Sequence, residues 1–151
     1  MRFGRGKWTV EVPPDWELID HEECVTLKRP EGALQFSSME KKAGVFEMAD
    51  VEGVAARCGG IAWGEFETVS AGEFSGIVFE YLENEVRWCR WFLANGVTFV
   101  FVTFNSEVER SEQTRASIAQ VLGSLRTEPI RPNNLINRTT NALRALVAGY
   151  R

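Results

Sequence analysis

The stretch that decides the fold runs from Phe74 to Phe104 and reads FSGIVFEYLENEVRWCRWFLANGVTFVFVTF. It contains three runs rich in β-branched and aromatic residues, separated by short polar segments, which predicts three consecutive antiparallel strands. The pair Asn95-Gly96 tolerates the positive φ angles of a two-residue type I′ hairpin turn, so we place the second turn there. In that register Phe92 faces Phe99.

The first turn is placed at Asn84-Glu85, which puts Tyr81 opposite Trp88. One face of the three strands then carries large aromatic residues and one arginine: Ile77, Phe79, Tyr81, Trp88, Arg90, Phe92, Phe99 and Phe101. The other face is built from Gly76, Val78, Leu82, Cys89, Trp91, Val100 and Val102. Because neither face is polar, we expect both to be covered. The aromatic face is either core, the usual fate of such side chains, or the floor of a binding groove.

The residues before this stretch predict further strands and one helix. β-rich or alternating composition predicts short strands at residues 7–12, 16–19, 24–28, 33–38 and 63–69. A helix is predicted between the last two, because Met48, Val51, Val54 and Ala55 have helical spacing. Its end is placed at Cys58, which two glycines follow.

Two more helices are predicted towards the C-terminus. Ser106 and Glu109 have the spacing of a capping box, so we place a helix start there. The helix buries a stripe formed by Ile118, Val121, Leu122 and Leu125. Pro129 and Pro132 indicate a linker, and residues 135–150 predict an amphipathic helix. The sequence therefore predicts an α+β fold, an antiparallel β-sheet flanked by helices in an α/β/α sandwich, with a domain at 1–126 and a linker plus extra C-terminal helix at 127–151.

Charge is distributed unevenly along the 151 residues, whose composition is that of an ordinary globular domain with 44% hydrophobic residues. The net charge is −4, while residues 1–7 carry +3 and residues 126–151 carry +4, which leaves −11 for the acidic body between them. This pattern is either ordinary solvated charge or a site for a basic partner.

The three cysteines, Cys24, Cys58 and Cys89, are an odd number without motif spacing. The N-terminus has no apolar signal region, and no apolar run is long enough to span a membrane. We therefore expect free thiols, a cytoplasmic location and no membrane span.

Two phrases of the sequence resemble the PsbP-like fold family: Val12-Pro13-Pro14-Asp15-Trp16, and a final strand followed by a helix that ends in Val121-Leu122-Gly123-Ser124-Leu125. The resemblance covers about residues 7–126 and implies an α/β/α sandwich around an antiparallel sheet. Members of this family are mostly non-catalytic; they include an extrinsic subunit of photosystem II, a Ran-binding import factor, bacterial lipoproteins and effector-associated chaperones of type VI secretion. No functional residue is carried over from them.

No residue pattern predicts a catalytic, metal or cofactor site. His21, the one histidine, stands beside Glu22 and Glu23 without a nucleophile or further ligands at suitable spacing, which is typical of a solvated turn. The segment 87–91 mixes arginine and tryptophan, but its side chains alternate between the two faces of a strand. Since the acidic body also repels nucleic acid, we expect no nucleic-acid partner and explain Arg90 by cation–π packing.

The sequence thus favours a non-catalytic protein-binding module. The most specific version, a cytoplasmic chaperone or immunity-type partner of a secreted effector, rests on the resemblance alone. The alternatives are a small enzyme with an unrecognised site and a structural or oligomerisation protein. The predicted partner-binding residues are Phe79, Tyr81, Trp88, Arg90 and Phe101 of the aromatic face and Leu143, Leu146 and Tyr150 of the C-terminal helix. That helix docks on its own domain, on a partner, or on a second copy as a homodimer.

Overall fold

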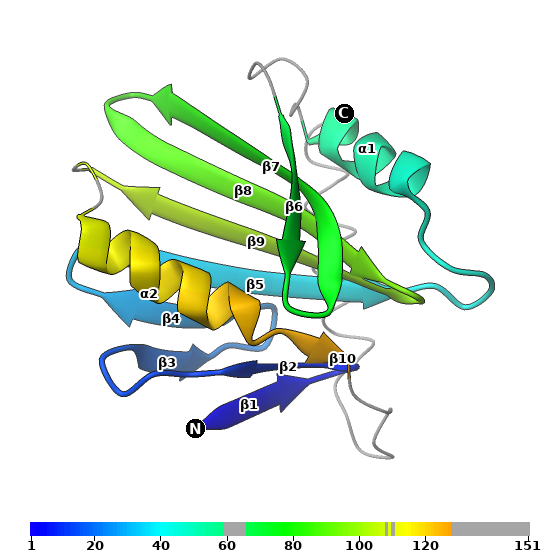
Figure 1. Ribbon diagram of the computed structural model, residues 1–151, viewed down its shortest axis with the longest axis horizontal. Coiled ribbons are helices and arrows are strands. Elements are labelled where there is room, and N and C mark those ends of the chain that lie inside the picture. The colour runs from blue at the N-terminus through cyan, green and yellow to red at the C-terminus, as the bar shows by residue number, and fades with distance from the viewer. Residues whose placement is uncertain (59–65, 108, 110, 128–151) are drawn as a thin grey trace.

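A seven-stranded antiparallel sheet forms the centre of the computed structural model, which describes residues 1–58, 66–107, 109 and 111–127 (Figure 1). Its strand order is β3-β4-β5-β9-β8-β7-β6. The strands are β3 (Glu17–Asp20), β4 (Val25–Arg29), β5 (Gly32–Glu40), β6 (Glu67–Ala71), β7 (Phe74–Glu83), β8 (Val86–Asn95) and β9 (Thr98–Ser106). The predicted α+β class with an antiparallel sheet is confirmed, and the 74–104 meander forms three neighbouring strands of it.

A second sheet of three strands consists of β1 (Arg2–Arg5), β2 (Trp8–Glu11) and β10 (Arg126–Thr127). The sequence did not predict β1, because two of its four residues are arginines. The structure gives both arginines partners: the Arg2 guanidinium donates to the Thr9 hydroxyl at 2.9 Å, and Arg5 pairs with Asp20 of the large sheet. These contacts let a basic segment form an ordered strand.

The two hairpin turns of the meander differ from each other. The turn at Asn84-Glu85 is confirmed, with Tyr81 opposite Trp88, and both turn residues have positive φ (53° and 66°) as in a type I′ turn. The prediction at Asn95-Gly96 is wrong by one residue. Asn95 pairs with Thr98, so Gly96 and Val97 are the central residues.

Gly96 alone has positive φ, at 57°, which fits a type II′ turn with glycine at the first central position. As a result Phe92 opposes Phe101 rather than Phe99. The correction moves each opposing residue by two positions, and side chains alternate with a period of two. Every predicted face is therefore preserved.

The aromatic face of the sheet is covered by helix α1 (Met48–Arg57). The residues that pack there are Val51, Val54, Ala55, Cys58, Ile77, Phe79, Phe92, Ala94, Phe99 and Phe101. The helix is confirmed where its spacing predicted it, with Cys58 as the C-terminal cap residue. This packing makes the aromatic face part of the core.

The opposite face packs against helix α2 (Glu112–Gly123) and the three-stranded sheet (Figure 1). Ile118, Val121, Leu122 and Leu125 are buried as predicted. The predicted start at Ser106 is wrong, because β9 continues through this residue, where it pairs with Arg87. The helix instead begins after Ser111, whose hydroxyl accepts a hydrogen bond from the Thr114 N–H at 3.1 Å.

Several predictions fall partly or wholly outside the residues that the structure describes. The first half of the predicted strand 63–69 and the C-terminal helix at 135–150 are among them, and the domain boundary at residue 126 stays a prediction. Within the described part of the chain, no helix has the length and apolar character that crossing a membrane requires.

Candidate functional site

Two of the predicted partner-binding residues lie inside the core. Phe79 is 1% exposed and Phe101 is 4% exposed, both beneath α1. Arg90, which pairs with Phe79 across the β7–β8 ladder, is also buried. These side chains contribute to stability, and a partner could reach the two phenylalanines only if α1 moved away.

Tyr81 and Trp88 are half-buried near the tip of the β7–β8 hairpin. Their rings stack with centroids 6.4 Å apart, and the Arg90 guanidinium lies 5.2 Å from the Trp88 ring and 6.0 Å from the Phe101 ring. The cation–π packing predicted for Arg90 is thus present. Tyr81 and Trp88 therefore pack against each other and against Arg90, and each stays partly exposed. Leu143, Leu146 and Tyr150 lie outside the described residues.

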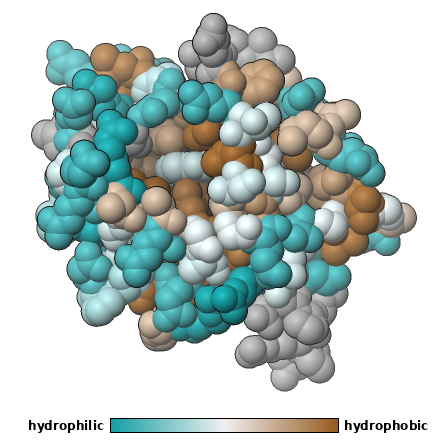
Figure 2. All heavy atoms as spheres, viewed as in Figure 1, coloured by the Kyte–Doolittle hydropathy of each residue, from teal (hydrophilic) through white to brown (hydrophobic). Residues whose placement is uncertain are grey.

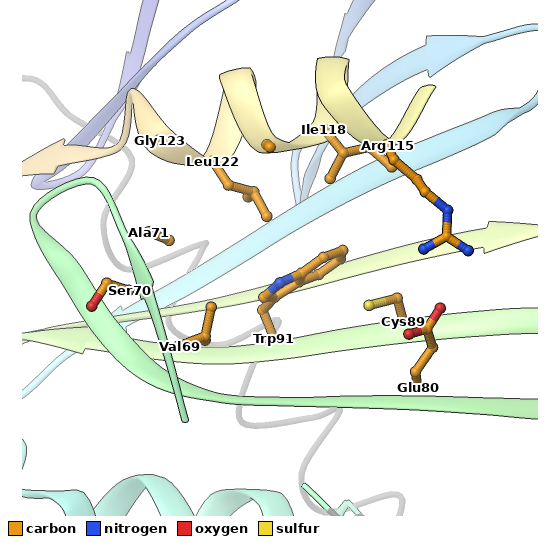
Figure 3. Close-up of a pocket in the computed structure, with 11 residues that line it drawn as sticks. Val69, Ser70, Ala71, Glu80, Cys89, Trp91, Arg115, Ile118, Leu122 and Gly123 are labelled. Atoms are coloured by element: carbon orange, nitrogen blue, oxygen red, sulfur yellow. The ribbon is translucent and has the colours of Figure 1, made fainter. Parts of the chain in front are cut away.

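A pocket that the sequence did not predict lies between α2 and the strands β6, β7 and β8. We call it the α2 pocket; its volume is about 320 Å³. It is lined by Val69, Ser70, Ala71, Glu80, Cys89, Trp91, Arg115, Ile118, Ala119, Leu122 and Gly123 (Figure 3). Figure 2 shows apolar surface in a recess near the centre of this side of the molecule, with hydrophilic residues around it.

Contacts at both sides of α2 fix the walls of this pocket. On one side, the Trp16 indole N–H donates to the Ser117 hydroxyl at 2.7 Å. On the other, the β6–β7 turn lies against the end of α2, where the Glu73 N–H donates to the Leu125 carbonyl at 2.9 Å. Gly72 makes that approach feasible, because a Cβ at this positive-φ position would lie 2.2 Å from the same carbonyl oxygen. The pocket is therefore held by ordered contacts.

The floor of the α2 pocket is apolar and one end of it is charged. Trp91, Ile118 and Leu122 are each 5–7% exposed and form the apolar part. In Figure 3 the Arg115 side chain extends from α2 towards Glu80, and Cys89 lies beside that carboxylate. Glu80 and Cys89 are neighbours across the β7–β8 ladder. The arrangement suits a group that is apolar over most of its surface and charged at one end.

Two of the three walls of this pocket could be predicted from the sequence. The alternation of β8 placed Cys89 and Trp91 on one face, and the helical stripe placed Ile118 and Leu122 on the sheet. What was missing is the third wall, β6, whose Val69 joins them only through the pairing of β6 with β7. Pairing between strands cannot be read from the composition of either strand alone.

The other residues considered for catalysis or metal binding, Cys58 and His21, do not form a reactive site. Burial raises the pKa of the Cys58 thiol, and the Arg90 guanidinium opposes that shift, so this buried thiol stays protonated and unreactive. His21 is exposed, and its carbonyl accepts a hydrogen bond from Arg5. In residues 1–58, 66–107, 109 and 111–127, no three histidine, cysteine or acidic side chains are grouped so as to hold a metal ion.

Comparison with known proteins gives the fold and no activity. No protein-family model matches this chain, and no curated protein matches it either. Among solved structures, the chain is similar to a crystal structure of a protein from Bacteroides thetaiotaomicron VPI-5482, with a TM-score of 0.59 and 14% sequence identity. The match covers 83% of this chain and 50% of that chain, so this chain spans half the length of that protein. At this identity the likeness shows the fold alone, and the PsbP-like resemblance stays a proposal.

Proposed function

We propose that this chain is a non-catalytic protein-binding module and that the α2 pocket is its binding surface. The observation that carries the proposal is the apolar recess itself, with a further exposed apolar side chain along β7 on the same sheet face. Val78, on the same sheet face, is half-buried, and Leu82, further along β7, is 64% exposed. An apolar recess surrounded by hydrophilic surface is typical of a site where another protein docks.

The proposal includes the family and the setting that the sequence favours. The antiparallel sheet, with α1 on one face and α2 on the other, is compatible with a PsbP-like fold. A chaperone or immunity-type partner of a secreted effector is the specific version that this resemblance suggests. The three free cysteines are compatible with a reducing cytoplasm.

A variant that fills the pocket tests the proposal. Ala119 lines the pocket at an exposed position of α2, so Ala119→Phe places a ring in the recess without changing charge. Ala56→Phe, at an exposed position of α1, is the matched control. Proteins captured from the native cell by the wild type and by the control, but lost with Ala119→Phe, would be partners of the pocket. Capture of the same proteins by all three would refute the site.

One observation favours a small enzyme as the second candidate. Cys89 lines the pocket beside the Glu80 carboxylate, with Arg115 at the same end, and a thiol with a base close to it can act as a nucleophile. A catalytic thiol reacts with iodoacetamide faster than an ordinary one. If Cys89, which is 4% exposed, is alkylated more slowly than the half-buried Cys24 in the folded protein, this candidate is excluded.

A further inference from the structure

The charged end of the α2 pocket contains one cation that a ligand can neutralise. Figure 3 shows the Arg115 side chain at one end of the pocket, extending from α2 towards Glu80. Arg115 takes part in none of the ion pairs found among the residues that the structure describes. Glu80, in contrast, already has an interaction partner. The charge at this end that a ligand can pair with is therefore the Arg115 guanidinium.

A guanidinium is a specific receptor for a carboxylate. Its planar fork can donate two parallel hydrogen bonds to the two carboxylate oxygens, and such charge-assisted bonds are stronger than neutral ones. Beside the fork lies the apolar floor of the pocket, with the Trp91 ring between Ile118 and Leu122 on one side and Val69 on the other (Figure 3). A ligand that uses both parts must place a carboxylate next to an apolar group.

We infer that the α2 pocket binds a carboxylate that carries an apolar group, with the carboxylate on Arg115 and the apolar group on Trp91. The inference rests on the proposed function, in which the α2 pocket is the binding surface. It adds the chemistry of the group that this pocket binds. The volume of about 320 Å³ is near the lower limit of about 300–1,000 Å³ for small-ligand sites. One aromatic ring or a short branched chain suits this space.

Two sources present this chemistry. One is a protein chain that ends in a large apolar residue, whose terminal carboxylate lies next to its side chain. The other is a free aromatic or branched-chain acid. The recognition is the same for both, so the pocket alone does not distinguish them, and the experiment has an arm for each.

The first arm is an NMR titration with 3-phenylpropanoate, observed at the indole N–H of Trp91. The matched ligand is the neutral amide of the same acid, which we expect to bind about tenfold more weakly or worse. Arg115→Gln should reduce binding of the acid to that of the amide, and Arg115→Lys should restore part of it. Arg57→Gln, an exposed arginine on α1 at the other face of the sheet, should bind the acid like the wild type.

The second arm uses a short peptide that ends in phenylalanine, with a free or an amidated C-terminus. Binding of the free form that matches or exceeds that of 3-phenylpropanoate would identify a protein C-terminus as the source; binding of the small acid alone would identify a free acid. Equal binding of acid and amide, an Arg115→Gln variant that binds like the wild type, or no binding of any probe would overturn the inference. If Ala119→Phe still abolishes capture of a partner in those cases, the protein-binding proposal stands without it.

Discussion

The indole N–H of Trp8 donates to the Ser38 hydroxyl oxygen at 2.8 Å, and both residues are fully buried. The bond joins β2 of the small sheet to β5 of the large one. Next to it, the Trp8 ring stacks on Phe36 with centroids 5.4 Å apart. Both contacts attach the small sheet to the large one. The stacked rings bury apolar surface, and the directional hydrogen bond beside them fixes the position of the small sheet.

Removing the acceptor of this bond should destabilise the protein. In Ser38→Ala the buried indole N–H loses its partner, and a buried unsatisfied donor costs about 1–3 kcal/mol. Ser37→Ala, at the neighbouring half-buried position of β5, should change the free energy of unfolding by less than about 0.5 kcal/mol. Urea unfolding monitored by tryptophan fluorescence measures both. Equal stability of the two variants would mean that the bond does not hold the sheets together.

The glycine in the β8–β9 turn should be required for its conformation. Gly96 has a φ of 57°, so Gly96→Ala should destabilise the fold by about 1 kcal/mol or more, although nothing lies within 4 Å of the added Cβ. Gly53, inside α1, also has open space around it but no positive φ. Gly53→Ala should therefore stabilise by about 0.5–1 kcal/mol. A melting temperature of Gly96→Ala equal to or above that of the wild type would contradict the turn assignment.

The β7–β8 turn could be predicted from the sequence, whereas the exact position of the β8–β9 turn could not. The register at Asn84-Glu85 was predictable, because Glu83 and Asn84-Glu85 are the only polar break between two long runs. At Asn95-Gly96, types I′ and II′ both accept glycine, and they differ by one residue in which pair is central. Asn-Gly favours type I′ from sequence alone, so the prediction placed these two residues at the centre of the turn. In the structure the Asn95 side chain donates to the Glu73 carbonyl oxygen, a long-range contact that adjacent residues cannot reveal.

The candidate site was likewise predictable in its local features but not in the features that depend on long-range packing. Alternation and helical spacing correctly assigned which face each residue of β8 and α2 occupies, so the core was largely predictable. They could not show that α2 leaves a recess beside β6, because the recess depends on how closely three separate segments approach. The partner-binding site was predicted on the aromatic face because the sequence does not show which segment covers that face. In the structure α1 covers Phe79 and Phe101.

The stability of the protein should fall at high pH because of Cys58. Burial holds the pKa of this thiol above its ordinary value of 9.0, so in the folded state the proton stays on while the unfolded chain releases it. The unfolded state then binds fewer protons, and the stability that is fully present below pH 9.0 is lost as the pH rises towards the folded pKa. Cys58→Ala removes this titration.

Chemical unfolding between about pH 8 and pH 10 measures the effect. The free energy of unfolding of the wild type should fall more steeply with pH than that of Cys58→Ala, whatever the difference between the two at neutral pH. Cys24→Ala retains Cys58, so its free energy of unfolding should still fall more steeply with pH than that of Cys58→Ala. Parallel pH profiles for the wild type and Cys58→Ala would show that Cys58 is accessible to water in the folded protein.

The segment after Thr127 should bury its apolar residues on another surface. The described domain ends in an ordered way, because β10 pairs with β2 and the Thr127 N–H donates to Glu73 at 3.0 Å. The residues that follow place Leu143, Leu146, Val147 and Tyr150 on one side at helical spacing. A helix of this length is marginal alone in water, so it needs a docking site.

Deleting residues 128–151 should therefore leave a folded domain and change either its oligomeric state or its exposed apolar surface. Each leucine that the segment buries contributes about 1.5–3 kcal/mol before ordering costs, so Leu143→Asp in the full chain should reproduce the effect. Ala145→Asp, on the opposite side of the predicted helix, should not. Light scattering separates a homodimer from a monomer, and binding of an apolar dye detects a surface uncovered within one chain. If the deleted and full-length proteins share the same oligomeric state, melting temperature and dye response, the segment docks on neither its own domain nor a second copy.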